Sequence, residues 1–213
     1  MSTIAAAEQR ITIEPPKFET IAVKIKGVSP YVQNKFSHKS RQQMMDKQRL
    51  GDQAKKSRKR EAKNFEQTYK DAMHLSREGW HGIPAPSFRN ALISACRIVG
   101  FKMTLAKLSV FIEADGFDGD EGTPLVKISG KPRVHESYVR NETGVADVRW
   151  RPMWEEWGAT VRIRYDANQF SASDVVNLLH RAGMQVGIGE GRPDSKNSAG
   201  QGWGMFTIQE GKQ

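Results

Sequence analysis

Apolar and polar side chains alternate in several segments of this chain, with the two-residue period of a half-buried β-strand. The clearest pattern is ATVRIRY at residues 159–165, and FETIAVKIK at residues 18–26 has the same period. Residues 105–113 and 203–208 are also rich in apolar or aromatic residues. These four segments predict the strands of one sheet.

Two other segments place their apolar residues at helical spacing. Residues 87–99 follow a proline-rich turn, and Ser87 is their candidate N-cap. Residues 171–182 form a second amphipathic segment, with Ser171 or Ser173 as the candidate N-cap. The resulting order is strand, helix, strand, strand, helix, strand. This order predicts an α+β fold of the ferredoxin-like or RRM-like type, in which two helices cover one face of an antiparallel sheet.

A basic insertion at residues 35–75 interrupts the expected single domain, which spans residues 1–213. Within residues 35–70 there are twelve Lys or Arg and only four Asp or Glu. This excess of eight positive charges is nearly the whole net charge of the chain, which is +9. Because apolar residues are sparse, we expect a partly helical segment that is mobile until it meets a polyanion. The alternative is an ordinary solvated, charged surface.

A second insertion is expected at residues 115–150, where 124–128 and 134–140 are short strand candidates. The sequence Ser-Gly-Lys-Pro at 129–132 joins them, so we expect a projecting hairpin. The loop at 115–122 alternates acids with glycine, but it lacks the glutamate that an EF-hand requires at its twelfth position. The sequence therefore predicts no metal and no cofactor.

Composition narrows the class of protein. The chain has 213 residues and an isoelectric point near 9.7, which is typical of a protein that binds a polyanion. A basic surface without a specific partner is the alternative. A single cysteine, Cys96, excludes an internal disulfide framework. Because there is no secretory signal and no apolar run near the roughly 18 residues that span a bilayer, we expect a soluble, cytoplasmic protein with no membrane partner.

Six glycines between Gly187 and Gly204 indicate a loop in which side chains must be small. Glycine lets successive N–H groups turn toward an anion, and Arg192 and Lys196 add positive charge. The loop is not a P-loop, because no Gly-Lys-Ser/Thr ends it, and not a Rossmann motif, because it enters a strand rather than a helix. It is a candidate phosphate site or, alternatively, a surface loop without a ligand.

The turn at residues 84–89, Pro-Ala-Pro-Ser-Phe-Arg, begins the first helix. Free N–H groups and the helix dipole favour an anion at such a position, and Arg89 supplies a cation. Proline before a capping serine is also ordinary helix-start chemistry, so the motif is compatible with a purely structural role.

These two segments resemble the RAMP superfamily, the RNA-binding subunits of CRISPR effector complexes and their relatives. Members carry a helix start of the form Ile-Pro-x-Ser-Ser-hydrophobic-Arg/Lys-Gly-x-hydrophobic-Arg. Residues 83–92 are similar to it and depart from it at Pro86 and Asn90. Members also carry a late glycine-rich loop with a Gly-aromatic-Gly step into the last strand. Residues 186–206 occupy this place, with an interruption at 193–199.

The resemblance implies a ferredoxin-like core that holds single-stranded RNA along the glycine loop and the insertions. It is closest to the backbone subunits that polymerise along a guide RNA, in which a projecting hairpin, the thumb, interrupts base pairing. We therefore expect a non-catalytic subunit of a filament or a multi-subunit CRISPR-type ribonucleoprotein for antiviral defense. Its partners would be single-stranded RNA or DNA, copies of itself and other subunits. The expected nucleic-acid-binding residues are Arg89, Lys55, Lys56, Arg58, Lys59, Arg60, Gly187, Gly189, Gly191, Arg192, Lys196 and Trp203.

Two other functions are compatible with the sequence. One is a metal-independent endoribonuclease of the same superfamily, in which a histidine helps to transfer protons. His81, next to the turn, is the candidate for this role, and His38 and His74 also lie in or near the basic segment. The other is a structural subunit that binds protein only.

Three tryptophans, Trp150, Trp154 and Trp157, lie near Arg149 and Arg151. An exposed aromatic ring that stacks on a base contributes about 1–3 kcal/mol to binding. Large aromatic residues at helical spacing usually fill a core, however, and we expect at least one of the three to be buried.

Overall fold

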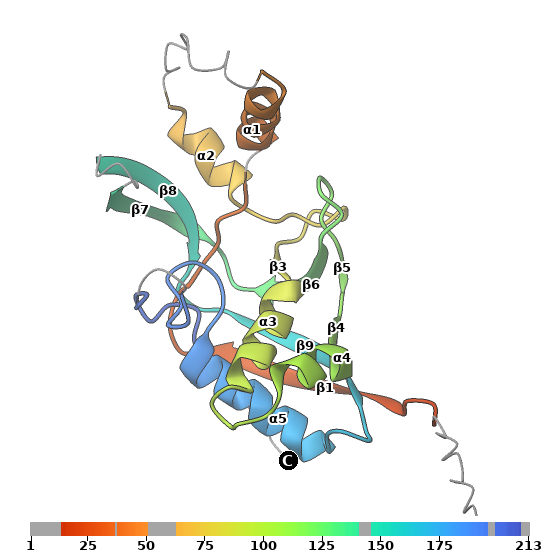
Figure 1. Ribbon diagram of the computed structural model, residues 1–213. Helices are drawn as coiled ribbons and strands as arrows, with labels where there is room; N and C mark the ends of the chain where they lie inside the picture. The colour runs from red at the N-terminus through yellow and green to blue at the C-terminus, as the bar shows by residue number, and fades with distance from the viewer. Residues whose placement is uncertain (1–13, 37, 51–62, 141–145, 196–198, 210–213) are drawn as a thin grey trace, which may run out of the picture.

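The computed structural model describes residues 14–36, 38–50, 63–140, 146–195 and 199–209 (Figure 1). These residues form an α+β structure with antiparallel sheets, as the sequence predicts. Within this described part of the chain, none of the helices has the length and apolar character needed to cross a bilayer.

The larger sheet contains seven strands among the described residues. They are β1 (Phe18–Gly27), β3 (Gly82–Pro84), β4 (Val110–Glu113), β5 (Gly116–Phe117), β6 (Pro124–Ser129), β9 (Gly158–Asp166) and β10 (Phe206–Ile208). Their order is β10-β1-β9-β6-β3, while β4 pairs with another part of β9 and β5 pairs with β6. All these pairs are antiparallel.

The central pair of this sheet is β1 with β9, and its register places apolar residues opposite one another. Val23 faces Val161, and the neighbouring Ile163 lies on the same face, because side chains alternate along a strand. All three are buried. The opposite face carries Lys24 and Arg162. The alternating pattern in the sequence therefore corresponds to one apolar and one polar face of the sheet.

Two helices, α3 (Ala85–Ala95) and α5 (Ala172–Arg181), pack on the apolar face (Figure 1). Phe88 and Leu92 of α3 and Leu179 of α5 are completely buried. Burial of a side chain of this size stabilises a fold by about 1.5–3 kcal/mol. These contacts fix α3, whose first turns form one wall of the site described below.

Helix α5 has the predicted cap. The Oγ of Ser171 accepts a hydrogen bond from the Asp174 N–H at 3.1 Å, and the Asp174 carboxylate accepts one from the Ser171 N–H at 3.0 Å. A capping box of this kind satisfies two N–H groups at once. A π-helical turn at Ala182–Val186 follows α5 and leads into the glycine loop.

Residues 105–113 do not form one strand, and this prediction is wrong. They fall in helix α4 (Met103–Ser109) followed by β4. Ala106 and Ser109 are the buried positions of α4, and a three-residue spacing suits a helix better than a strand. The β-branched residues after Ser109 then favour an extended chain.

Helix α3 and strand β10 are shorter than the predicted helix at 87–99 and the predicted strand at 203–208. Pro84, rather than Ser87, occupies the N-cap position of α3, without a side-chain hydrogen bond, and the helix ends at Ala95. The last strand begins at Phe206 rather than at Trp203. The reason is that Gly202 and Gly204 have φ angles of +71° and +68°, which an extended strand does not accommodate.

The smaller sheet corrects the predicted hairpin. Its strands are β2 (Tyr31–Val32), β8 (Ala146–Trp154) and β7 (Arg133–Arg140), in the order β2-β8-β7. The partner of β7 is therefore β8, and residues 124–128 belong to β6 in the larger sheet. Leu125 and Val126 of β6 are completely buried, so removing this strand from the core would expose them.

The β7–β8 ribbon extends away from the larger sheet, and helix α2 (Phe65–Asp71) packs against β8 (Figure 1). Helix α1 spans His38–Leu50. Trp150 is half-buried, and its ring centroid lies 5.5 Å from that of Phe65 in α2. Trp154 and Trp157 are buried in the core. The expectation that at least one of the three tryptophans is buried is therefore confirmed.

Ion pairs connect the basic insertion to acids at 115–150. Lys35 Nζ lies 3.0 Å from Asp118 Oδ1, and Asp118 is completely buried. Arg41 Nη2 lies 2.5 Å from Asp120 Oδ2, and Lys63 Nζ lies 2.8 Å from Asp147 Oδ1. The acids of the second insertion therefore neutralise cations of the first.

We predict that Asp118→Ala destabilises the protein by about 3 kcal/mol, because it leaves the nearly buried Lys35 without its closest partner. Asp120→Ala is the matched control. Its carboxylate is about half exposed, so its loss should cost less than about 1 kcal/mol. Urea denaturation at neutral pH measures both values, and equal losses would contradict the assignment of Asp118 as the anchor.

The contribution of Asp118 to stability should also depend on pH. Burial raises the pKa of Asp118, but hydrogen bonds from the Glu121 N–H, Lys35, His74 and the Asp120 N–H outweigh it and lower the pKa to about 2. An unfolded aspartate titrates near 3.9. The stabilisation is therefore complete above about pH 4 and is lost as the pH falls through about 2. The stability difference between wild type and Asp118→Ala should shrink over this window, and a constant difference would contradict the prediction.

Candidate functional site

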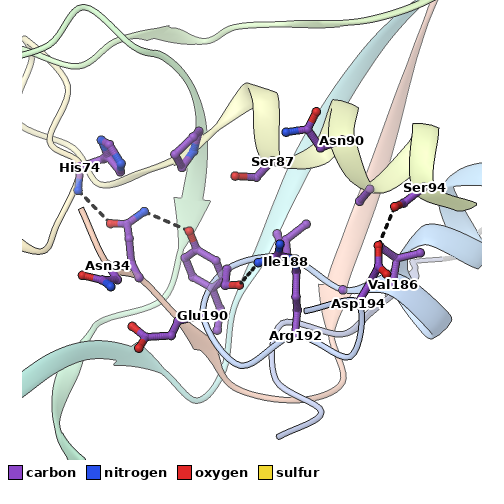
Figure 2. Close-up of a pocket in the computed structure, with 16 residues that line it drawn as sticks. Asn34, His74, Ser87, Asn90, Ser94, Val186, Ile188, Glu190, Arg192 and Asp194 are labelled. Atoms are coloured by element: carbon purple, nitrogen blue, oxygen red, sulfur yellow. Dashed lines mark hydrogen bonds between the residues drawn. The ribbon is translucent and has the colours of Figure 1, made fainter. Parts of the chain in front are cut away.

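The start of α3 and the glycine loop meet around one cavity of about 430 Å³ (Figure 2). The two segments are about 100 residues apart in sequence, and the sequence singled out both. A third wall comes from residues 31–34, at and after β2. The lining residues are Tyr31, Gln33, Asn34, His74, Pro84, Ser87, Asn90, Ala91, Ser94, Val186, Gly187, Ile188, Gly189, Glu190, Arg192 and Asp194.

Helix α3 turns one side toward the cavity. Ser87, Asn90, Ala91 and Ser94 line it, and these positions are three, four and seven residues apart, as on a single helix face. The helix start itself has few hydrogen-bond donors, because Pro84 and the residue two further on are both prolines without an N–H. This helix start is therefore poorer in donors for an anion than the sequence suggested.

The glycine loop needs glycine because its backbone packs closely on other backbone. At Gly189, with φ of +79°, an added Cβ would lie 2.5 Å from the carbonyl oxygen of Val32. At Gly204, with φ of +68°, it would lie 1.7 Å from the carbonyl oxygen of Ile188. Distances this short require the backbone to move, so glycine is required here by packing.

Several amides of the loop are already used inside the protein. The Ile188 N–H donates to the Gly204 carbonyl at 3.0 Å, and the Glu190 N–H donates to the Val32 carbonyl at 2.9 Å. The Gly187 N–H donates to the turn that precedes it. Within the described residues, the N–H groups of Gly189 and Gly191 donate no hydrogen bond. Of the three glycines predicted to bind a ligand in this loop, these two therefore have an N–H group that could donate a hydrogen bond to a ligand.

The charged residues of the cavity are largely paired. Arg192 Nη1 donates to the Gly189 carbonyl at 3.0 Å. Glu190 accepts from Arg151 Nε of the hairpin at 3.1 Å. Asp194 accepts from Ser94 Oγ at 2.5 Å and from Arg97 at 2.7 Å. The Ser94 hydroxyl in particular lowers the pKa of Asp194, so this carboxylate is ionised at neutral pH.

A second hollow of about 630 Å³ adjoins the first. Asn34 and His74 line both, and Phe36, Arg41 and Met44 from the basic insertion line the second. Burial lowers the pKa of His74, even though its Nδ1 lies 2.8 Å from Asp118 Oδ2. His74 is therefore neutral at pH 7. Together the residues that line the two hollows extend from the glycine loop to Arg41 and Met44 of α1.

The hairpin borders the other side of the loop. His135 of β7 packs edge-on against Trp203, with ring centroids 5.1 Å apart. Arg151 of β8 reaches Glu190, and Gly191 lies directly beneath the Trp203 ring. Trp203, which the sequence singled out, thus lies between the loop and the hairpin.

Two predicted residues lie elsewhere. Arg89 donates from Nε to the Val110 carbonyl at 3.0 Å and from Nη2 to the Lys107 carbonyl, and its guanidinium covers Phe111. His81 packs edge-on against Trp154 at 5.7 Å and does not line the cavity. Burial lowers the pKa of His81.

Six predicted binding residues cannot be placed. Lys55, Lys56, Arg58, Lys59, Arg60 and Lys196 lie outside the described residues. Asn34 and Asn90 line the cavity, and Arg151 bonds to Glu190 of its lining, although none of the three was predicted as a site residue. Asn90 was noted only as a departure from a motif, and no local pattern marks Asn34, which reaches the cavity through the pairing of β2.

No protein-family model matches this chain, and a search of curated proteins found no significant match. Among the described residues, no group of three or more His, Cys, Asp or Glu side chains is arranged to hold a metal ion.

We predict that Gly204→Ala destabilises the protein by at least about 3 kcal/mol, because the new Cβ would overlap the Ile188 carbonyl. Gly202→Ala is the matched control. Gly202 has a similar φ of +71°, but no atom lies within 4 Å of its added Cβ, so only the backbone cost of about 1–2 kcal/mol applies. Thermal unfolding compares the two, and equal losses would show that close packing does not require Gly204.

Proposed function

We propose that this protein is a non-catalytic, RAMP-like subunit that binds single-stranded nucleic acid, most consistently a guide RNA. The connectivity supports this proposal. Strand β1, helix α3, strands β4 and β9, helix α5 and strand β10 occur in this order along the chain, with other elements inserted between them, and the sheet contains the order β10-β1-β9-β4. Antiparallel strands in this order, with both helices on one face, are what a ferredoxin-like core would have, and this supports the proposal.

The observation that carries the proposal is the convergence of two distant motifs on one cavity. The helix start and the glycine loop that resemble RAMP motifs are independent in sequence, yet both line the same hollow. A structural role for each motif would not require them to meet. The adjoining hollow, which shares Asn34 and His74 with this cavity and reaches α1, adds to the surface that a strand could contact.

Aromatic and cationic groups around the cavity also suit a single strand. Trp203 and Arg192 belong to the loop, where Trp203 packs on His135 of the hairpin, and Phe36, which is 67% exposed, lines the adjoining hollow. Aromatic rings that stack on bases, together with cations that contact phosphates, bind single strands with little sequence preference. The β7–β8 ribbon is then the candidate thumb, and copies of the chain would assemble along the strand.

The geometry favours a binding role over cleavage. His81, the proposed proton-transfer residue, lies outside the cavity, and its ring is packed on Trp154. His74 lines the cavity, but its side chain is only 10% exposed and its Nδ1 is held by Asp118. RNA cleavage without added metal, abolished by His81→Ala, would instead support the endoribonuclease alternative.

We predict that the purified protein retains a bound strand, which sensitivity to RNase or DNase identifies. Free protein should bind single-stranded RNA with an affinity that falls steeply with salt, because counterions are released on contact. Arg192→Ala should reduce the slope of log K against log salt by about 0.7, the value for one phosphate contact on a single strand.

Lys107→Ala is the charge-matched control, because Lys107 is exposed on α4 and does not line the cavity. Its salt slope should equal that of wild type. Protein that carries no nucleic acid and fails to bind single strands at low salt would contradict the proposal. That outcome would favour a subunit that binds protein only.

A further inference from the structure

Three neutral polar side chains line the cavity without a partner. Within the described residues, the side chains of Asn34, Ser87 and Asn90 make no hydrogen bond, although all three line the hollow. Ser87 and Asn90 lie on the wall formed by α3, and Asn34 lies on the wall that follows β2 (Figure 2). Ser87 is half-buried, Asn34 and Asn90 are exposed, and no described protein group occupies their hydrogen-bonding atoms. These three are therefore available to a ligand.

Other polar groups in the same walls are engaged. Gln33 Nε2 donates to the Tyr31 hydroxyl at 3.0 Å and to the Gly82 carbonyl at 2.8 Å. Its Oε1 accepts from the His74 N–H at 2.8 Å. Gln33 is therefore held by the protein itself, whereas the side chains of Asn34, Ser87 and Asn90 bond to no other described residue.

The interior of the cavity is unfavourable for a phosphate group. The carboxylates of Glu190 and Asp194 both line it, and like charges repel more strongly where water is partly excluded. The prolines at the start of α3 supply no N–H, and the Ile188 and Glu190 amides are already bonded. A phosphate inside would meet two carboxylates, each already bonded to an arginine, although Arg192 and the Gly189 N–H, which donates to no other described residue, also line the cavity.

The remaining surface of the cavity suits a flat, neutral ligand. Ala91, Val186, Ile188 and Pro84 provide an apolar wall. The volume of about 430 Å³ lies within the range of small-molecule sites, which is about 300–1,000 Å³. An apolar wall with a few convergent donors and acceptors is the usual composition of such a site.

We propose that this cavity receives an unstacked nucleobase of the bound strand, whose edge bonds to Ser87, Asn90 and Asn34. This inference rests on the proposed function and adds to it the part of the nucleotide that enters the cavity. The phosphates stay outside, near Arg192. An amide side chain both donates and accepts, so Asn34 and Asn90 can match the edges of different bases by rotating.

The test compares two strands with the same phosphates. One is a uridine 30-mer, and the other is an abasic ribose-phosphate strand of equal length. Wild type should bind the abasic strand about ten-fold or more weakly, because one base contact contributes about 1–3 kcal/mol, or 5–150-fold. Its salt slope should be the same for both strands, since the phosphate contacts are unchanged.

The variant Ser87→Ala/Asn90→Ala locates this loss. It should weaken binding of the uridine strand about ten-fold and leave binding of the abasic strand unchanged, with an unaltered salt slope. Alanine favours a helix more than serine or asparagine does, so folding should be preserved. Asn177→Ala, at an exposed position of α5 outside the cavity, is the control and should bind both strands like wild type.

Each outcome has a distinct meaning. If wild type binds both strands equally, or if the double variant weakens both by the same factor, the base site is excluded while the nucleic-acid function stands. If wild type binds neither strand at low salt, the proposed function fails and the base site fails with it.

Discussion

The site depends on two close contacts between backbone segments that leave no room for a side chain. The glycine loop crosses itself where Gly204 meets Ile188, and it lies against β2 where Gly189 meets Val32. The carbonyl of Val32 also accepts the Glu190 N–H. Since β2 pairs with β8 as well, one two-residue strand holds both the loop and the hairpin. The cavity and the hairpin therefore keep a fixed relation to each other.

The fold could be predicted best in segments where apolar residues keep one spacing, either that of a strand or that of a helix, from end to end. Strands β1 and β9 and helix α5 have clear patterns because each packs one face on the core. The strands of the hairpin could not be predicted. Strand β6 lies next to β7 in sequence, but burial of Leu125 favours β6 in the larger sheet, and β7 pairs with β8 instead. Helix α4 was missed because a short apolar run is compatible with either period until its partners are known.

The two motifs of the site could be found from the sequence, but the groups that face the cavity could not all be found. With about 100° per residue, Arg89 lies roughly 200° around α3 from Ser87, so only one of them can face the loop. The sequence did not show which one. Asn34 and Arg151 reach the site through strand pairing across more than 100 residues, and no local pattern encodes such a pairing.

Charge counted along a chain differs from charge that a ligand can use. Lys35, Arg41 and Lys63 belong to the basic insertion, and each is paired with an acid between residues 118 and 147. The two insertions are therefore mutual counter-ions across the fold. A polyanion that competed for Lys35 would have to leave the buried Asp118 carboxylate without its cation, held only by neutral donors, at a cost of several kcal/mol. The local excess of eight charges is an upper limit on the electrostatic attraction that this segment offers to a strand.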